Sequence, residues 1–280
     1  MIRNKIEKIV KKKMYRDYFE SLMDKFSELY SPEFKGLFPA SRELMAELNE
    51  GFRFWFNTGD KEMGVLMAFG FYEPESVEMI KKLIKPGMKC LDIGGQSGFY
   101  TCLIASLVGD NGRVYAFEPK PSNYRLLVKN VEENNYKNRV QHYQLACSNK
   151  AAPMDAYEVS NMYVLGKVDG AKKVTILTVR VDDVIKESID FIKIDVEGHE
   201  PAAIEGMSSL IERCKPIILS EINEYWLRTC SNSDGNKYVS QLMAQGYEIY
   251  KVNNLKQPIA ADSLKLDILD KIDIIAYPKK

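Results

Sequence analysis

The stretch from Asp92 to Gly98 and the acid Glu118 could together hold a nucleotide-type cofactor. The stretch reads D-I-G-G-Q-S-G after an apolar run, and Glu118 ends a second apolar run twenty residues after Gly98. Glycines allow a sharp turn and let a ligand approach the backbone closely. A helix that begins at Gly98 would offer the free N–H groups of its first turn. An acid at the end of the second strand is placed to accept hydrogen bonds from both ribose hydroxyls.

Asp92 indicates which cofactor fits. In a dinucleotide fingerprint this position would be a glycine with the pyrophosphate just beyond it, and a carboxylate there would repel the phosphates. S-adenosylmethionine (SAM) carries an ammonium and a sulfonium and no phosphate, so we expect SAM rather than NAD. The alternatives are a strand-to-helix turn without a ligand and, for Glu118, a surface acid. The paired spacing of the turn and Glu118 favours a cofactor site.

Two segments resemble the FkbM-type SAM-dependent methyltransferases. Residues 90–135 match the family's D-x-G-A-N-x-G turn and its following G-x-V-x-A-F-E-P, with Gly95 and Gln96 in place of Ala-Asn. Residues 181–222 contain the specific run I-K-I-D-V-E-G-x-E, with Val181 in the place of a leucine. Together the matches cover about residues 72–222.

The resemblance implies a role for each matching residue of the cofactor pocket. Asp92, Gly94 and Gly98 would shape the methionine end, and Glu118 would hold the ribose. The other implied pocket residues are Gly95, Gln96, Phe99, Tyr100 and Thr101 around the helix start, Pro119, Ala146 and Cys147 beside the adenine, and Tyr72 and Glu73, which match a Y-E pair of the family.

The run K-I-D-V-E-G-H-E-P supplies candidates for the chemistry. Methyl transfer from a sulfonium is a displacement of an activated group, so the protein mainly positions the acceptor. A hydroxyl acceptor must also lose a proton to a base. Asp195 and Glu197 follow the fourth strand, and His199 lies near a helix start, where the dipole favours the neutral imidazole that a base needs. Glu221, after the fifth strand, completes the predicted catalytic set. A surface histidine is the alternative interpretation of His199.

The same acids allow a second mechanism. Asp195, Glu197 and Glu221 would offer hard oxygen ligands to a divalent ion such as magnesium, which would bind and acidify the acceptor hydroxyl. The spacing does not demand a metal, so we assign no metal ligands.

The elements that must position these residues form an α/β pattern from about residue 76. Strands that alternate with helices predict a doubly wound, mostly parallel sheet, and the resemblance implies the seven-stranded class I Rossmann-like methyltransferase fold. We expect a mainly helical N-terminal extension or cap over 1–75, with helices over 1–30 and 41–50, and a methyltransferase domain over 76–280. Expected strands are 88–93, 112–118, 139–146, 190–196, 216–222, 247–252 and 272–277, and expected helices include 98–108, 121–134, 200–213 and 235–245.

Composition limits the partners. Lysine plus arginine and aspartate plus glutamate number 39 each, so no overall field attracts nucleic acid. Five cysteines without a C-x-x-C pair indicate a reducing, cytoplasmic compartment. No apolar stretch is long enough to predict a transmembrane segment.

The sequence therefore predicts a cytoplasmic methyltransferase that uses SAM to methylate a hydroxyl on a small molecule, with a glycan or natural-product intermediate favoured by the resemblance. The N-terminal helices are expected to cover the acceptor site or to form a homodimer contact. The alternatives are a protein or nucleic-acid methyltransferase on the same fold, and a binding module without turnover.

Overall fold

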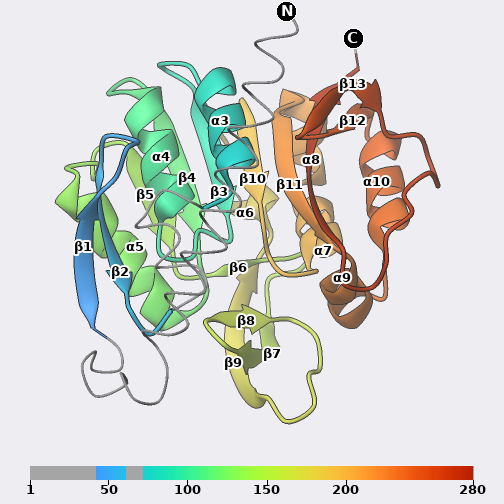
Figure 1. The fold of residues 1–280 in the computed structure, drawn as a ribbon, viewed down its shortest axis with the longest axis horizontal. Helices are drawn as coiled ribbons and strands as arrows, with labels where there is room; N and C mark the ends of the chain where they lie inside the picture. The colour runs from blue at the N-terminus through green and yellow to red at the C-terminus, as the bar shows by residue number, and fades with distance from the viewer. Residues whose placement is uncertain (1–41, 61–71, 280) are drawn as a thin grey trace, which may run out of the picture. The chain divides into compact units, whose positions relative to one another are not determined.

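The main sheet of this computed structural model, which describes residues 42–60 and 72–279, has eight strands. Its order is β13-β12-β14-β11-β10-β3-β4-β5 (Figure 1). From β11 to β5 all neighbours are parallel, and β14 runs antiparallel to both β11 and β12. The strands are β3 (Lys89–Ile93), β4 (Arg113–Phe117), β5 (Val140–Tyr143), β10 (Phe191–Ile194), β11 (Ile217–Asn223), β12 (Tyr247–Lys251), β13 (Asn254–Pro258) and β14 (Lys271–Pro278).

The class I Rossmann-like arrangement is confirmed, with one strand more than predicted. The additional strand is β13, which pairs with β12 at the edge of the sheet. The chain adds β4 and β5 on one side of β3 and then returns to add β10 on the other side. The strand order therefore reverses between β3 and β10, and ligands of such sheets bind beyond the carboxyl ends of the strands at this point.

Helices cover both faces of the sheet because its central strands, such as β10, carry buried apolar side chains on both sides. One core cluster joins α3, α4 and α5 to the sheet, and the other joins α6 to α10. The predicted helix over 200–213 is divided at Gly206, where a Cβ atom would lie 1.9 Å from the Ser148 carbonyl oxygen. The helices are α3 (Pro74–Leu83), α4 (Phe99–Val108), α5 (Pro121–Glu133), α6 (Val181–Val184), α7 (Glu200–Glu205), α8 (Ser208–Cys214), α9 (Glu224–Ser231) and α10 (Gly235–Ala244).

The helix predicted over 41–50 is wrong, because β1 (Glu43–Glu47) and β2 (Arg53–Asn57) form a two-stranded sheet there. Gly51 adopts a φ of 85° in the turn between them, and the Leu48 N–H donates to the Phe52 carbonyl at 3.0 Å. Phe52 and Phe54 are buried and belong to the cluster that contains α4. Burial of these aromatic side chains therefore outweighs the helical propensity of 41–50.

The predicted helix over 1–30 lies outside the described residues, and the predicted domain boundary at residue 75 stays a prediction. By contact density the chain divides into two compact units, residues 1–43 with 57–59 and residues 44–56 with 60–280. Among the described residues, no helix is both long and apolar enough to cross a membrane.

Residues 146–179, which the sequence left unassigned in part, form a second sheet of four strands in the order β6-β9-β7-β8. Figure 1 shows it projecting from one end of the main sheet. It has a small core of its own around Ala156 and Ile176. Its strands are β6 (Ala146–Cys147), β7 (Pro153–Val159), β8 (Met162–Val164) and β9 (Lys172–Val179).

Ile192→Ala tests how far the fold depends on the middle of β10. Ile192 is fully buried and aligns with Leu91 and Ile218 on the neighbouring strands. Removing its branched side chain leaves a cavity, so we expect a loss of about 2–5 kcal/mol in the free energy of unfolding. Urea unfolding measures this loss. Leu177→Ala, at an exposed position of β9, serves as the control and should change stability by less than about 0.5 kcal/mol; equal losses in both variants would contradict the prediction.

Candidate active site

The turn after β3 lies directly against the residue that follows β10. Gly94 has a φ of 84°, and a Cβ atom on it would lie 1.8 Å from the Asp195 carbonyl oxygen. The N–H groups of Gly94 and Gly95 both donate to the Phe117 carbonyl at 2.9 Å. Only glycine fits at position 94, and this close approach brings the ends of three strands together.

A cavity lies at these strand ends. It brings together Gln96, Glu118, Asp195, Glu197 and His199 of the polar residues that the sequence singled out, and it extends to the second sheet. Its lining comprises Gly94, Gln96, Phe117, Glu118, Pro119, Asn123, Leu145, Ala146, Cys147, Met162, Tyr163, Leu165, Ile176, Asp195, Val196, Glu197 and His199.

Glu118 is held in one orientation by the backbone around it. One carboxylate oxygen accepts from the Gln96 N–H at 3.0 Å and the other from the Lys120 N–H at 2.8 Å. Burial raises the pKa of Glu118 to about 7, although these two hydrogen bonds act in the opposite direction. A carboxylate oxygen has more than one lone pair, so the ionised form can also accept the hydroxyls of a ribose.

Asp92 is fully buried, and only one of its two carboxylate oxygens has a hydrogen-bond partner among the described residues. Its Oδ2 accepts from the Thr101 hydroxyl at 2.5 Å, and its Oδ1 has no hydrogen-bond partner among the described residues. Burial raises the pKa of Asp92, and the neighbouring Lys193 opposes that shift. A buried carboxylate with an unused oxygen suits a cofactor that carries positive charge, and would be costly beside a pyrophosphate.

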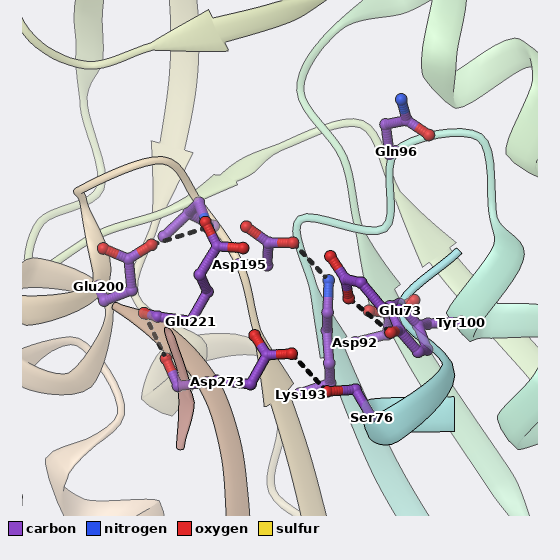
Figure 2. A network of polar contacts seen from close by, with 12 residues as sticks. Glu73, Ser76, Asp92, Gln96, Tyr100, Lys193, Asp195, Glu200, Glu221 and Asp273 are labelled. Atoms are coloured by element: carbon purple, nitrogen blue, oxygen red, sulfur yellow. Dashed lines mark hydrogen bonds and ion pairs between the residues drawn. The ribbon is translucent and has the colours of Figure 1, made fainter. Parts of the chain in front are cut away.

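Lys193 of β10 connects Asp92 to the acids on the other side of the site (Figure 2). Its Nζ lies 3.1 Å from Asp195 Oδ2 and 4.7 Å from the centre of the Tyr100 ring. The Tyr100 hydroxyl donates to Glu73 at 2.6 Å. Burial opposes the charge on Lys193, but Asp195 and Asp92 outweigh it and raise its pKa. Lys193 therefore remains an ammonium inside the protein.

Three carboxylates converge beyond Lys193. Glu73, Asp195 and Glu221 each place one oxygen within 4.8 Å of the others. Lys271 of β14 forms ion pairs with Glu221 and, at 3.7 Å, with Glu73. Burial and then Asp195 raise the pKa of Glu221, whereas Lys193 and Lys271 outweigh burial and lower that of Asp195. The magnesium hypothesis is not supported: the acids that converge include Glu73 and not the expected Glu197, and Lys193 and Lys271 already pair with them.

Glu197 reaches the cavity on a strained loop. Its φ is 52° and that of Gly198 is 86°. Glu200 Oε1 holds the loop by accepting from the N–H groups of Val196 at 3.0 Å and Gly198 at 3.2 Å. Burial, followed by the charge of Asp195, raises the pKa of Glu197 to about 8. Glu197 is thus an acid that exchanges its proton close to neutral pH.

His199 is placed differently from the other predicted catalytic residues. Its side chain is buried, and Nε2 lies 3.0 Å from the Ser148 hydroxyl. Burial lowers its pKa to about 4, so the imidazole is neutral. It lines the cofactor cavity but does not belong to the carboxylate group around Asp195. Its catalytic role stays a prediction.

Several predicted cofactor residues support the described part of the cavity from behind instead of lining it. Tyr72 and Phe99 pack edge to face at 5.5 Å beside Tyr100. Gly95 and Gly98 lie against Leu127, where a Cβ atom would be about 3 Å away. Their roles as direct cofactor contacts stay predictions, as does that of Glu73. The residues in this group are Tyr72, Glu73, Asp92, Gly95, Gly98, Phe99, Tyr100 and Thr101.

The sequence analysis did not identify the two lysines near the acids, or the residues of the second sheet that line the cavity. Lys193 stands inside the run K-I-D-V-E-G, so its position two residues before Asp195 was a usable signal. Lys271 is brought beside the site by the antiparallel pairing of β14, in which Asn223 aligns with Lys271. Met162 and Tyr163 come from the second sheet. Nothing in the sequence near these three residues indicated a pocket.

Comparisons with known proteins agree with this geometry. Residues 92–249 match the model of the methyltransferase FkbM domain. The hexuronic acid methyltransferase AglP of Haloferax volcanii is 25% identical over 134 residues, which are 46% of this chain and 53% of AglP. A protein-L-isoaspartate O-methyltransferase of Methanothrix thermoacetophila is 36% identical over 67 residues, 23% of this chain and 32% of that enzyme.

A solved structure of a methyltransferase FkbM from Methylobacillus flagellatus superposes with a TM-score of 0.47 at 17% identity, covering 72% of this chain and 50% of that one. The chain thus spans about a third to a half of the length of the curated relatives named here. The family model matches more than half of the chain, on the segment that carries the cavity and its acids. The chain therefore belongs to the FkbM methyltransferase family and has a SAM-dependent methyltransferase fold.

Proposed function

We propose that this protein transfers the methyl group of SAM to a hydroxyl of a small molecule, with a glycan as the favoured acceptor. The observation that carries the proposal is the position of Asp195 and Glu197. Both line the cofactor cavity, and Asp195 also belongs to the carboxylate group beyond it. An acceptor beside them would meet a base and the cofactor at once.

The residues of the cavity fit SAM. SAM supplies an activated methyl group when it is bound. Glu118 would accept the ribose hydroxyls, since the Gln96 and Lys120 N–H groups already fix its carboxylate. Asp92, with its unpartnered oxygen, would balance the positive charge of the methionine end.

Glu197 is the base in this proposal. A base works best when its pKa lies near the working pH, and the pKa of Glu197 is raised to about 8. Asp195 stays ionised beside Lys193 and would orient the acceptor hydroxyl without taking its proton. The two lysines keep the net charge of the site low, so that Glu197 can ionise when substrate is bound.

A glycan acceptor is supported by the aromatic start of α9. The Trp226 backbone lies against the Glu197 loop, since a Cβ atom on Gly198 would be 2.1 Å from the Trp226 carbonyl oxygen. Tyr225 is 41% exposed, and its ring centre is 4.8 Å from that of Trp226. Aromatic rings beside a site stack well on the apolar face of a sugar. AglP, named for a hexuronic acid, is a relative that acts on such a molecule.

A protein acceptor is the second candidate, because short segments match protein-L-isoaspartate O-methyltransferases. Those matches cover less than half of each enzyme. An isoaspartyl peptide is therefore included as a probe in the transfer assay below.

Thermal unfolding with added ligands tests the cofactor. A ligand present at about a hundred times its dissociation constant adds about 2.7 kcal/mol, which should raise the Tm by about 5 °C. We expect this shift with SAM and with S-adenosylhomocysteine (SAH) and none with NAD or NADP. A shift with NAD alone would overturn the proposed cofactor.

Substitutions at the two acids test the chemistry. We expect Asp195→Asn and Glu197→Gln to bind SAH within about threefold of the wild type, because neither carboxylate is assigned to the cofactor. Methyl transfer should fall by about a hundredfold or more in Glu197→Gln, the loss typical of a missing general base. Radiolabelled SAM with a panel of glycosides and an isoaspartyl peptide measures transfer. Full activity in Glu197→Gln would remove Glu197 as the base.

The pH dependence of stability tests the environment of Glu197 without any acceptor. Its pKa is about 8 in the folded protein and near 4.5 when unfolded. The stability gained by keeping it protonated is therefore complete below pH 4.5 and is lost as the pH rises to about 8. Glu197→Gln cannot ionise, so its stability relative to the wild type should increase between pH 5 and pH 9, by up to about 4 kcal/mol. Thermal unfolding across this range measures the difference; a constant difference would contradict the assignment.

A further inference from the structure

The β7–β8 hairpin is attached to the start of α5 by an ion pair and a hydrogen bond. Lys120 Nζ lies 2.6 Å from Glu158 Oε1, and the Asn123 side chain donates to the Asn161 carbonyl at 2.9 Å. The Lys120 side chain is only 7% exposed and that of Glu158 is 31% exposed. These contacts join two segments that are about forty residues apart in the sequence.

The fastened hairpin forms one wall of the cofactor cavity. Met162 and Tyr163 of β8 line the cavity together with Ile176 of β9. The Lys120 ammonium lies 4.9 Å from the centre of the Tyr163 ring, so the same charge that binds Glu158 also contacts the wall. An apolar and aromatic wall of this kind suits the flat face of a purine.

Lys120 also connects this wall to the predicted ribose site. Its backbone N–H donates to Glu118 while its side chain reaches the hairpin. The hydrogen bond from Lys120 lowers the pKa of Glu158, although burial acts in the opposite direction, so the Glu158 carboxylate stays ionised. Removing Glu158 would leave a nearly buried ammonium with one partner fewer, which is unfavourable.

We infer that Lys120 and Glu158 are positioning residues that hold Met162 and Tyr163 against the purine of the bound cofactor, and that this ion pair sets how long the nucleoside stays bound. This inference rests on the proposed SAM site. In addition to the proposed SAM site, it assigns the nucleoside end of the pocket to the second sheet, which lies outside the main sheet. The ion pair must loosen for the wall to move, so breaking it should accelerate release of the product.

The test is the dissociation rate of SAH from the purified full-length protein, measured by surface plasmon resonance. We expect Glu158→Gln and Lys120→Met each to release SAH about tenfold faster, because loss of one partner of a desolvated charge pair acts mainly on dissociation. The charge-exchanged double variant Lys120→Glu with Glu158→Lys should return to within about threefold of the wild type. Such a rescue would show that the ion pair itself, and not either side chain alone, sets the dissociation rate.

Asp155→Asn is the matched control, since Asp155 pairs with Lys173 at 2.7 Å on the same strands but with both side chains more than half exposed. It should leave SAH dissociation within about twofold of the wild type. An unchanged rate in Glu158→Gln, or an equal acceleration in Asp155→Asn, would overturn the inference while the SAM site stands. If the wild type binds neither SAM nor SAH, the proposed function itself fails.

Discussion

The contact between Gly94 and the Asp195 carbonyl is the constraint on which the site depends. Because no side chain fits at position 94, the turn after β3 and the end of β10 can approach until the cofactor cavity and the carboxylate group share one residue, Asp195. The parallel register, with Asp92 beside Lys193, then places a buried ammonium between the two acids. Backbone packing at a single point thus joins the cavity to the carboxylate group.

Buried charge is the second organising feature. Asp195, Glu221 and Glu73 would repel one another if the two lysines were absent, and Lys193 would be costly to bury without its acids. Because of these neighbouring charges and burial, the carboxyl groups differ in how tightly they bind a proton. Asp195 is kept ionised, whereas Glu197 and Glu221 hold their protons more tightly. Two carboxyl groups of different proton affinity within one site are suited to separate roles in orientation and proton transfer.

The second sheet adds a part that the parallel sheet alone does not provide. The main sheet supplies the glycine turn and the acids Glu118, Asp195 and Glu197 from its strand ends. The hairpin β7–β8 supplies an apolar wall and is attached through Lys120, whose backbone also serves Glu118. One residue therefore links the polar and the apolar halves of the cavity.

The sequence by itself determined the family, seven of the eight strands of the main sheet, and the acids Asp92, Glu118, Asp195 and Glu197. Local signals sufficed, because these acids directly follow apolar runs and glycine marks the turns. The tertiary structure alone decided that residues 43–47 form the strand β1 and no helix, that Lys271 reaches Glu221, and that Tyr163 lines the cavity. These depend on burial and on pairing between distant segments, which no short stretch of sequence encodes.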